Sequence, residues 1–206
     1  MAKERFLDSA YEARTGAEVE AFYDRWAAVY DEEVTENAYQ QPLRCAEAMK
    51  RNLTPDAGRI LDVGCGTGLS GIALHEAGYQ HIDGCDFSQG MLEKAFKTGV
   101  YSKLFKADLN NPPLDAHDGE YAGVAAVGVF SFSHISADAM DEVLRVTAPG
   151  GPIVIGMNNH FHEEGSVSAK LDQLAADGRI ERVSEEQGEH LPGIDLTGWV
   201  IVVRKR

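Results

Sequence analysis

Residues 60–68, Ile60-Leu61-Asp62-Val63-Gly64-Cys65-Gly66-Thr67-Gly68, decide the fold that this sequence predicts. The apolar start predicts a strand, and the three glycines predict a loop that leads into a helix. Because glycine lacks a Cβ atom, the backbone can turn tightly and lie against a ligand. The backbone amides at the start of the helix can hold a carboxylate or a phosphate. The stretch therefore predicts a ligand-binding loop between a strand and a helix.

Apolar runs alternate with amphipathic segments from Gly58 onward, which is typical of a parallel sheet with helices on both faces. Strands are expected at residues 59–65, 81–87, 102–108, 121–130, 153–157, 180–184 and 199–204. Helices are expected from Leu69 to the stop at Gly78, from a Ser88 cap to Gly99, from Ser136 to the stop at Pro149, and over residues 167–176. The short connection between the last two strands predicts an antiparallel pair at one sheet edge. We therefore expect an α/β fold, Rossmann-like and doubly wound: a mostly parallel seven-stranded sheet with an antiparallel edge strand and helices on both faces.

An aromatic helix is expected ahead of the sheet. Phe22, Tyr23, Trp26 and Tyr30 fall at three- and four-residue spacing, which predicts an amphipathic helix over about residues 18–33. A second helix is expected over residues 38–50. We assign residues 1–57 to an N-terminal helical cap or lid and residues 58–206 to the core of one compact domain. Whether the aromatic helix closes over a ligand or is permanently docked stays open.

Composition excludes several classes of partner. The chain has 206 residues, 44% of them hydrophobic, which suits one α/β domain with a substantial core. Its formal net charge of -14 repels polyphosphate, and the only basic cluster is Arg204-Lys205-Arg206. We therefore expect no nucleic-acid partner.

The cysteines and the apolar segments indicate the compartment. Cys45, Cys65 and Cys85 are widely spaced, which fits neither a disulfide framework nor a zinc site. Residues 1–10 lack the apolar run of a signal peptide, and no apolar stretch is long enough to span a bilayer. These features predict a cytoplasmic protein with no membrane partner.

The glycine loop distinguishes between two nucleotide cofactors. A nicotinamide or flavin fingerprint would place its third glycine or alanine at position 69, where this chain has Leu69. An acidic residue, Asp62, also stands just before the loop. This spacing favours S-adenosylmethionine over a dinucleotide.

The same stretch resembles motif I of the class I S-adenosylmethionine-dependent methyltransferases, and the later strand ends match the rest of that family's series. The resemblance implies that Asp86, ending the second strand, accepts both ribose hydroxyls, since a planar carboxylate suits two syn hydroxyls. It implies that Phe87 and Met91 flank the adenine. Asp108 would accept from the adenine amino group, with Leu109 against the ring.

The resemblance also implies that Gly128, in Gly128-Val129-Phe130, lies beneath the methionine half of the cofactor. Taken singly, Asp86 is more often a helix-capping residue and Asp108 a turn former. Ligands bind at the carboxyl ends of strands in open parallel sheets, so acidic residues at consecutive strand ends converge on one crevice. The expected cofactor-binding residues are Tyr30, Asp62, Gly64, Gly66, Thr67, Gly68, Asp86, Phe87, Met91, Asp108, Leu109 and Gly128.

A narrower resemblance covers most of the chain. The segment from Phe22 to Asp31, together with motif I and residues 128–134, is similar to the family named for the Williams-Beuren syndrome chromosomal region methyltransferase. In such enzymes a tyrosine at the Tyr30 position commonly lies over the cofactor. A core aromatic residue with a satisfied hydroxyl is the alternative for Tyr30.

Three histidines follow the fourth and fifth expected strands. His134, His160 and His162 are candidates to line the acceptor side. The His160-x-His162-Glu163-Glu164 pattern is expected on an exposed loop and also fits a metal site, but no third ligand has recognisable spacing, so we expect no metal. Asn158 and Asn159 are expected to finish a strand.

These observations predict an S-adenosylmethionine-dependent methyltransferase that acts on a small-molecule acceptor and releases S-adenosylhomocysteine. The sulfonium activates the methyl group, so no covalent nucleophile is needed and no catalytic residue is assigned. If the acceptor must lose a proton, His134 or Tyr30 is a candidate base. The alternatives are a non-catalytic regulatory protein that binds S-adenosylmethionine or S-adenosylhomocysteine and, more distantly, a nicotinamide oxidoreductase.

Overall fold

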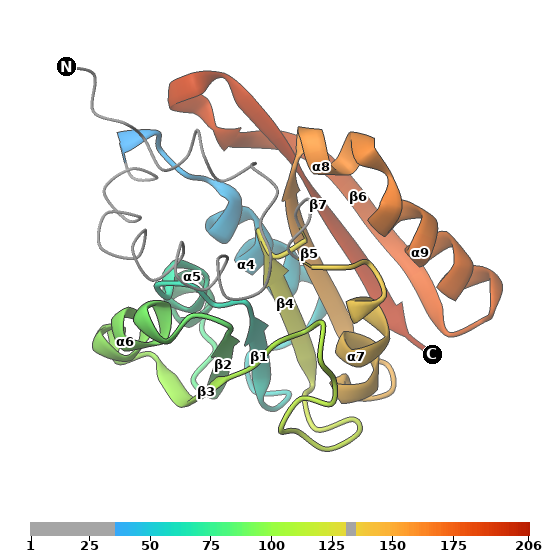
Figure 1. The fold of residues 1–206 in the computed structure, drawn as a ribbon, viewed down its shortest axis with the longest axis horizontal. Helices are drawn as coiled ribbons and strands as arrows, with labels where there is room; N and C mark the ends of the chain where they lie inside the picture. The colour runs from blue at the N-terminus through green and yellow to red at the C-terminus, as the bar shows by residue number, and fades with distance from the viewer. Residues whose placement is uncertain (1–35, 131–134) are drawn as a thin grey trace.

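Seven strands form a single sheet in the order β3-β2-β1-β4-β5-β7-β6, with helices on both sides (Figure 1). The computed structural model describes residues 36–130 and 135–206. The aromatic helix expected at residues 18–33, with Tyr30, and His134 lie outside the described residues. The predicted seven-stranded, Rossmann-like α/β fold is confirmed.

The strands lie close to the predicted positions. They are β1 (Ile60–Val63), β2 (Ile82–Asp86), β3 (Tyr101–Lys106), β4 (Gly123–Val127), β5 (Pro152–Asn158), β6 (Ile180–Leu191) and β7 (Leu196–Lys205). The helices are α4 (Gln41–Asn52), α5 (Leu69–Glu76), α6 (Gln89–Thr98), α7 (Ala139–Val146), α8 (Asn159–Glu164) and α9 (Ser166–Ala176), with the short 3-10 helix η1 (Pro192–Ile194). None of the helices within the described ranges is long and apolar enough to cross a membrane.

The strand directions confirm an antiparallel pair at one edge of a mostly parallel sheet. Strands β1 to β5 pair in parallel with one another. Strand β7 pairs antiparallel with both β5 and β6, so it alone runs opposite to the other six. The antiparallel strand therefore lies one position inside the edge, and β6 forms the edge itself.

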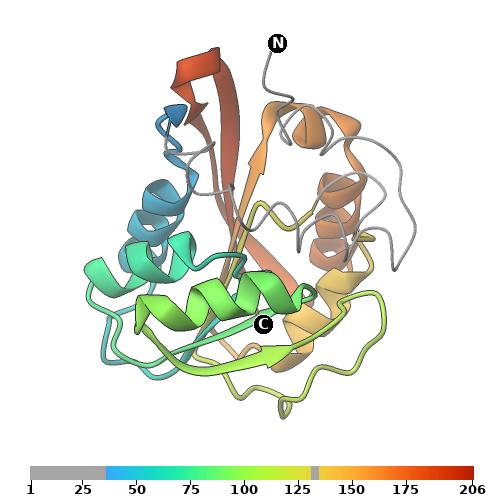
Figure 2. The same cartoon turned by 60° about the vertical axis from the view of Figure 1, so that its left-hand side comes forward.

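Two helical layers bury the two faces of the sheet (Figure 2). Alternate strand residues point to opposite faces. Ile60 and Val154 pack with α4 and α5 on one face, whereas Leu61 and Ile155 pack with α7 and α9 on the other. All residues of β1 and β5 are buried, as expected for central strands that carry helices on both sides.

Capping residues determine where several helices begin and end. Ser88 caps α6, because its Oγ accepts a hydrogen bond from the Met91 amide at 3.1 Å, as the sequence predicts. Gly99 ends α6 in the left-handed conformation with φ of +71°. The second predicted helix is α4, shifted from residues 38–50 to Gln41–Asn52 with a proline in its first turn.

The segment after β5 differs from the prediction. Asn158 does end a strand, but Asn159 begins α8, so His160 and His162 lie on a helix instead of a loop. Asn158 Oδ1 accepts a hydrogen bond from the Phe161 amide at 3.1 Å and thereby caps α8. The expectation of a loop was wrong because this cap signal was not recognised.

Polar contacts hold α4 against the β6–β7 hairpin. Gln41 Nε2 donates to the Trp199 carbonyl at 2.6 Å. The Arg44 guanidinium donates to the carbonyls of Glu186, Glu189 and Gly198 at 2.8, 3.0 and 3.1 Å. One side chain of α4 thus satisfies three backbone acceptors of the hairpin.

Candidate functional site

The predicted glycine loop joins β1 to α5 at the carboxyl ends of the parallel strands. Gly64, Gly66 and Gly68 have φ of +62°, +53° and +100°, a region that side chains other than glycine rarely adopt. A Cβ atom on Gly64 would lie 2.7 Å from Val129 Cγ2, and one on Gly68 would lie 2.9 Å from Thr98 Cγ2. A Cβ on Gly66 would meet no described atom within 4 Å. Among the described residues Gly66 therefore borders open space, whereas its neighbouring glycines allow close packing.

Asp86 lies directly against this loop. Its Oδ2 accepts a hydrogen bond from the Gly66 amide, and its Oδ1 accepts one from the Ser88 amide, both at 2.9 Å. The Ala107 amide donates to the Asp86 carbonyl at 2.9 Å, which brings the segment after β3 alongside. The carboxylate predicted for the ribose thus also anchors the loop.

Asp62 lies in the interior beneath the loop. It is fully buried, and its Oδ2 accepts hydrogen bonds from Ser70 Oγ and Tyr101 Oη, both at 2.7 Å. Its Oδ1 is buried and has no hydrogen-bond partner among the residues that the structure describes. Burial raises the pKa of Asp62 to about 6, although the two hydroxyl groups lower it. Asp62 therefore holds α5 and β3 together below the loop.

The Tyr101 ring reaches Asp62 across strand β2. Gly84 of β2 pairs in register with Asp62, and a Cβ on Gly84 would lie 2.8 Å from Tyr101 Cε1. A Cβ on Gly71 would also collide with the Tyr101 ring, and one on Gly68 would lie 3.3 Å from it. Three glycines thus form a slot for the ring, and burial raises the pKa of Tyr101.

Sequence reasoning missed Ser70 and Tyr101. Both supply hydroxyl donors to Asp62, yet neither belongs to the glycine motif. The signal that marks them is glycine inside regular elements, Gly71 in α5 and Gly84 in β2, because an interior glycine often indicates close packing of a large neighbour.

The remaining predicted residues lie around the same edge of the sheet. Phe87 is half-buried, with Lys106 Nζ 5.8 Å from its ring centroid. Asp108 forms the turn that the alternative predicted, since its Oδ1 accepts from the Asn110 amide at 2.9 Å and its Oδ2 from Asn111 Nδ2 at 2.7 Å. A carboxylate accepts about four hydrogen bonds, so Asp108 retains acceptor capacity. Met91, Leu109 and Thr67 are buried.

Gly128 follows β4 with φ of +73°, and its amide donates to the Gly156 carbonyl at 2.8 Å. A Cβ on Gly128 would lie 3.3 Å from Tyr39 Oη. Strands β1 and β4 are neighbours in the sheet. After β1 the chain continues to α5 on one face, and after β4 it continues to α7 on the opposite face. This reversal is the switch point at which open α/β sheets bind ligands.

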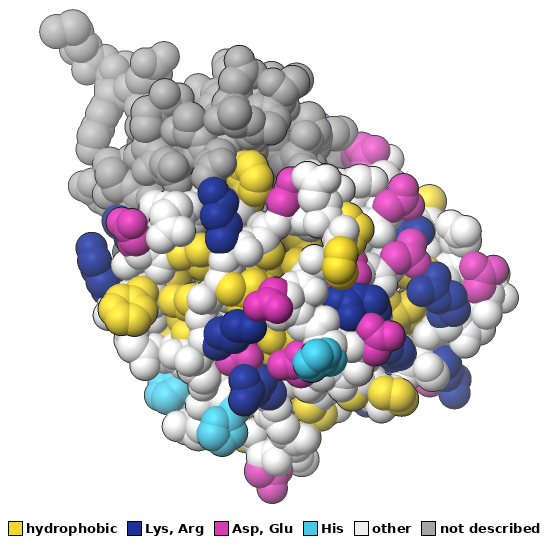
Figure 3. All heavy atoms as spheres, turned by 60° about the horizontal axis from the view of Figure 1, so that its bottom comes forward, with side chains coloured by type: hydrophobic (Ala, Val, Ile, Leu, Met, Phe, Trp, Pro, Cys, Tyr) yellow, Lys and Arg dark blue, Asp and Glu magenta, His cyan; other side chains and the backbone are white. Residues whose placement is uncertain are grey.

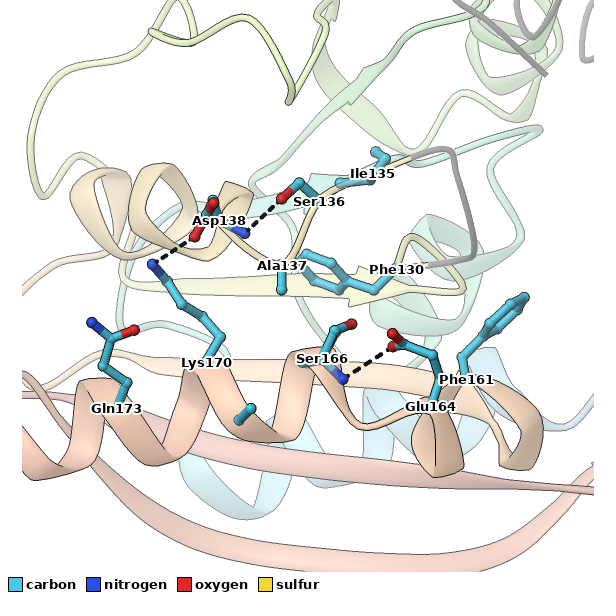
Figure 4. A pocket seen from close by; sticks show the side chains of 12 residues that line it. Phe130, Ile135, Ser136, Ala137, Asp138, Phe161, Glu164, Ser166, Lys170 and Gln173 are labelled. Atoms are coloured by element: carbon cyan, nitrogen blue, oxygen red, sulfur yellow. Dashed lines mark hydrogen bonds and ion pairs between the residues drawn. The ribbon is translucent and has the colours of Figure 1, made fainter. Parts of the chain in front are cut away.

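A cavity of about 420 Å³ adjoins the end of β4 (Figure 4). Phe130 and residues 135–138, which precede α7, form one wall, and α8 and α9 form the other. Its lining includes Phe130, Asp138, Phe161, Glu164, Ser166 and Lys170. Phe130 is two residues beyond Gly128, so the end of β4 contributes residues both to the region of the glycine loop and to the cavity.

The histidines take different positions. His162 stacks on Trp199, with ring centroids 4.1 Å apart, and its Nε2 is 2.6 Å from Glu185 Oε1. These contacts direct His162 toward β6 and β7, and it is not among the residues that line the cavity. His160 is exposed on α8, next to Phe161. Within residues 36–130 and 135–206, no three His, Cys, Asp or Glu side chains are grouped to hold a metal ion.

Charges of both signs mix on the face shown in Figure 3, where Lys and Arg alternate with Asp and Glu. The coloured part of this face carries no segregated basic stripe. The basic cluster at residues 204–206 contributes to strand packing, since Arg204 donates to the Gly150 carbonyl at 2.7 Å and Arg206 pairs with Glu181 at 2.9 Å.

The fold and the loop together define an α/β protein with a glycine loop at the switch point of a mostly parallel sheet. A family described as "Methyltransferase domain" matches residues 60–151. Human methyltransferase-like protein 27 is 34% identical over 165 residues, covering 78% of this chain and 67% of that protein. The chain therefore belongs to the S-adenosylmethionine-dependent methyltransferases, with S-adenosylmethionine as the cofactor and S-adenosylhomocysteine as the product.

Two further comparisons agree with this family. A demethylmenaquinone methyltransferase of Clavibacter sepedonicus is 34% identical over 142 residues, covering 67% of this chain and 57% of that protein. A solved S-adenosylmethionine-dependent methyltransferase from Thermotoga maritima has the same fold, with a TM-score of 0.63, 18% identity, and coverage of 90% of this chain and 98% of that one. The chain thus spans roughly two thirds or less of the two curated relatives. The narrower resemblance to the Williams-Beuren family stays a prediction.

Proposed function

We propose that this methyltransferase holds S-adenosylmethionine over the Gly64–Gly68 loop and methylates a small-molecule acceptor bound in the adjoining cavity. The observation that carries the proposal is the open space at Gly66 beside the Asp86 carboxylate. The residues present fit the cofactor, because a cradle without side chains lies next to a carboxylate that can accept from hydroxyl groups.

The protein's own contribution is position and exclusion of water. When bound, S-adenosylmethionine supplies a methyl group that its sulfonium has already activated. We assign Asp86 to the ribose, Asp108 to the adenine amino group and Gly128 to the methionine half. Phe87, Met91 and Leu109 would pack around the adenine. Asp62 acts from below by fixing the start of α5.

The size of the cavity supports a small acceptor. Its volume of about 420 Å³ falls within the range of small-molecule pockets, about 300–1,000 Å³. The net charge of -14 disfavours nucleic acid as the acceptor. The three cysteines are buried and unpaired, which supports a reducing, cytoplasmic location.

We also propose that residues 1–57 form a cap over the core at residues 58–206, with Tyr30 facing the cofactor. Helix α4, within this cap, already packs on the sheet, so we place any closing movement before it. Tyr30 and His134 are the candidates for relaying a proton from the acceptor to solvent.

Two measurements on the full chain test the proposal. Calorimetry should show S-adenosylhomocysteine binding, and radiolabelled S-adenosylmethionine should transfer its methyl group to a component of a small-molecule extract. Transfer only to protein or nucleic acid would contradict the small-molecule acceptor. Binding without any transfer would instead support a non-catalytic sensor.

A further inference from the structure

The cavity beside β4 contains charged groups whose pairing indicates what it binds. Three of its lining residues are ionisable, Asp138, Glu164 and Lys170. Lys170 Nζ contacts Asp138 Oδ1 at 3.0 Å and Asp141 Oδ2 at 2.5 Å, and only 12% of its side chain is exposed. Arg179 pairs with the second oxygen of Asp141 at 2.6 Å. These two cations and two carboxylates neutralise one another.

Glu164 remains as the uncompensated charge of the cavity. Its Oε2 accepts a hydrogen bond from the Ser166 amide at 3.0 Å, and no cationic side chain of the described residues pairs with it. Hydrogen bonds from Ser166 hold the pKa of Glu164 below its ordinary value, so the carboxylate is ionised at neutral pH. The cavity therefore presents net negative charge to an occupant.

Two aromatic rings accompany this carboxylate. Phe130 is buried at the end of β4, and Phe161 lies on α8 one turn before Glu164 (Figure 4). Aromatic faces attract cations and pack against apolar groups. An ionised carboxylate beside two aromatic rings is chemically suited to an organic ammonium group attached to an apolar body.

We propose that the methyl acceptor of this enzyme is an amine, bound as its ammonium form near Glu164 with its apolar part against Phe130 and Phe161. This inference rests on the proposed cofactor site and adds the class of substrate. A carboxylate acceptor would meet Glu164 unfavourably, and Lys170 is already paired with two carboxylates. A neutral hydroxyl group would leave the charge of Glu164 unused.

Methyl transfer to the amine takes two steps. The bound ammonium first loses one proton to solvent, which frees the nitrogen lone pair. The lone pair then forms a new bond to the methyl carbon while the bond from that carbon to sulfur breaks. The electron pair of the broken carbon–sulfur bond stays on sulfur, which becomes a neutral thioether. The positive charge passes to the methylated nitrogen.

Calorimetry with three matched probes tests the inference on the full chain. Phenylethylamine, phenylethanol and phenylacetate share one aromatic body and differ in charge. S-adenosylhomocysteine binding is measured first, because its absence would refute the cofactor site independently of the substrate class. With S-adenosylhomocysteine saturating, the amine should bind about fivefold more tightly than the alcohol, the advantage expected of one exposed charge pair, and the acid most weakly.

Two neighbouring glutamates supply the variant and its control. Glu164→Gln should remove the preference for the amine over the alcohol. Glu163→Gln should preserve it, because Glu163 bonds to Asn159 and does not line the cavity. The inference is overturned if the amine fails to bind, if the alcohol or the acid binds as tightly, or if the two variants give the same preference.

Discussion

Replacing Tyr101 with phenylalanine should destabilise the protein more at about pH 8 than at about pH 5. The variant keeps the ring in its three-glycine slot and removes the hydroxyl that donates the 2.7 Å hydrogen bond to Asp62. A hydrogen bond to a charged group contributes about 1.5–3 kcal/mol, and one between neutral groups contributes about 0.5–1.5 kcal/mol. The size of the loss therefore depends on whether Asp62 is ionised.

The direction of this pH dependence follows from the raised pKa of Asp62. Its pKa is about 6 in the folded protein and about 3.9 in an unfolded chain, so the folded state binds the proton more tightly. The free energy of unfolding therefore falls as the pH rises between these two values. Losing the Tyr101 hydroxyl raises the folded pKa further, which extends this fall to higher pH. We expect a loss of about 2 kcal/mol at about pH 8 and about 1 kcal/mol at about pH 5.

Urea unfolding of the wild type, Tyr101→Phe and Tyr79→Phe at both pH values measures this difference. Tyr79 is the matched control, because its hydroxyl also donates one hydrogen bond of 2.7 Å, in this case to the neutral Leu53 carbonyl. Its loss should be about 1 kcal/mol at either pH. A Tyr101→Phe loss that does not change with pH, or that never exceeds the loss of the control, would refute the proposed link to an ionised Asp62.

Three further predictions concern the cofactor. Asp86→Ala should weaken S-adenosylhomocysteine binding by about one to two decades in calorimetry, because it removes the ribose acceptor and the anchor of the loop. The control variant Asp115→Ala, at an exposed position, should bind normally. Equal affinities of the two variants would refute the assignment of Asp86. Gly66→Val should abolish binding, while Gly178→Val, with a similar φ of +70° and equally open surroundings, should retain it. S-adenosylhomocysteine should slow amide exchange over residues 18–37 beyond any slowing in the sheet. Unchanged exchange there would identify a permanently docked helix.

Sequence patterns predicted the elements that depend on local rules. The glycine loop, the Ser88 cap and the central strands follow from glycine placement, capping chemistry and continuous apolar runs. The β6–β7 hairpin was predicted too short, at residues 180–184 and 199–204. Much of β6 is exposed and rich in glutamate, so it lacks an apolar alternation to mark it as a strand. Its backbone pairing with β7 extends the strand regardless of its side chains.

The candidate site was predicted only in part, because sequence patterns indicate strand ends but not the contacts between strands. Asp86 was singled out because it ends the second strand, where the family that the sequence resembles places a carboxylate, and the structure places it against the glycine loop. The bond between Asp62 and Tyr101 could not be predicted, since it joins β1 to β3 across a glycine of the strand between them. The cavity depends on how α7 and α9 pack, which periodicity does not specify.

The interior position of β7 imposes an order on folding during synthesis. A ribosome releases β5 and β6 before β7, so the growing chain holds a central strand that still lacks its neighbour. At that stage the seven residues of β5, all buried in the finished protein, present an unpaired apolar edge. Such edges are templates for aggregation. Insertion of residues 196–205 between β5 and β6 closes that edge, and slow translation of this stretch would prolong the exposure of the edge.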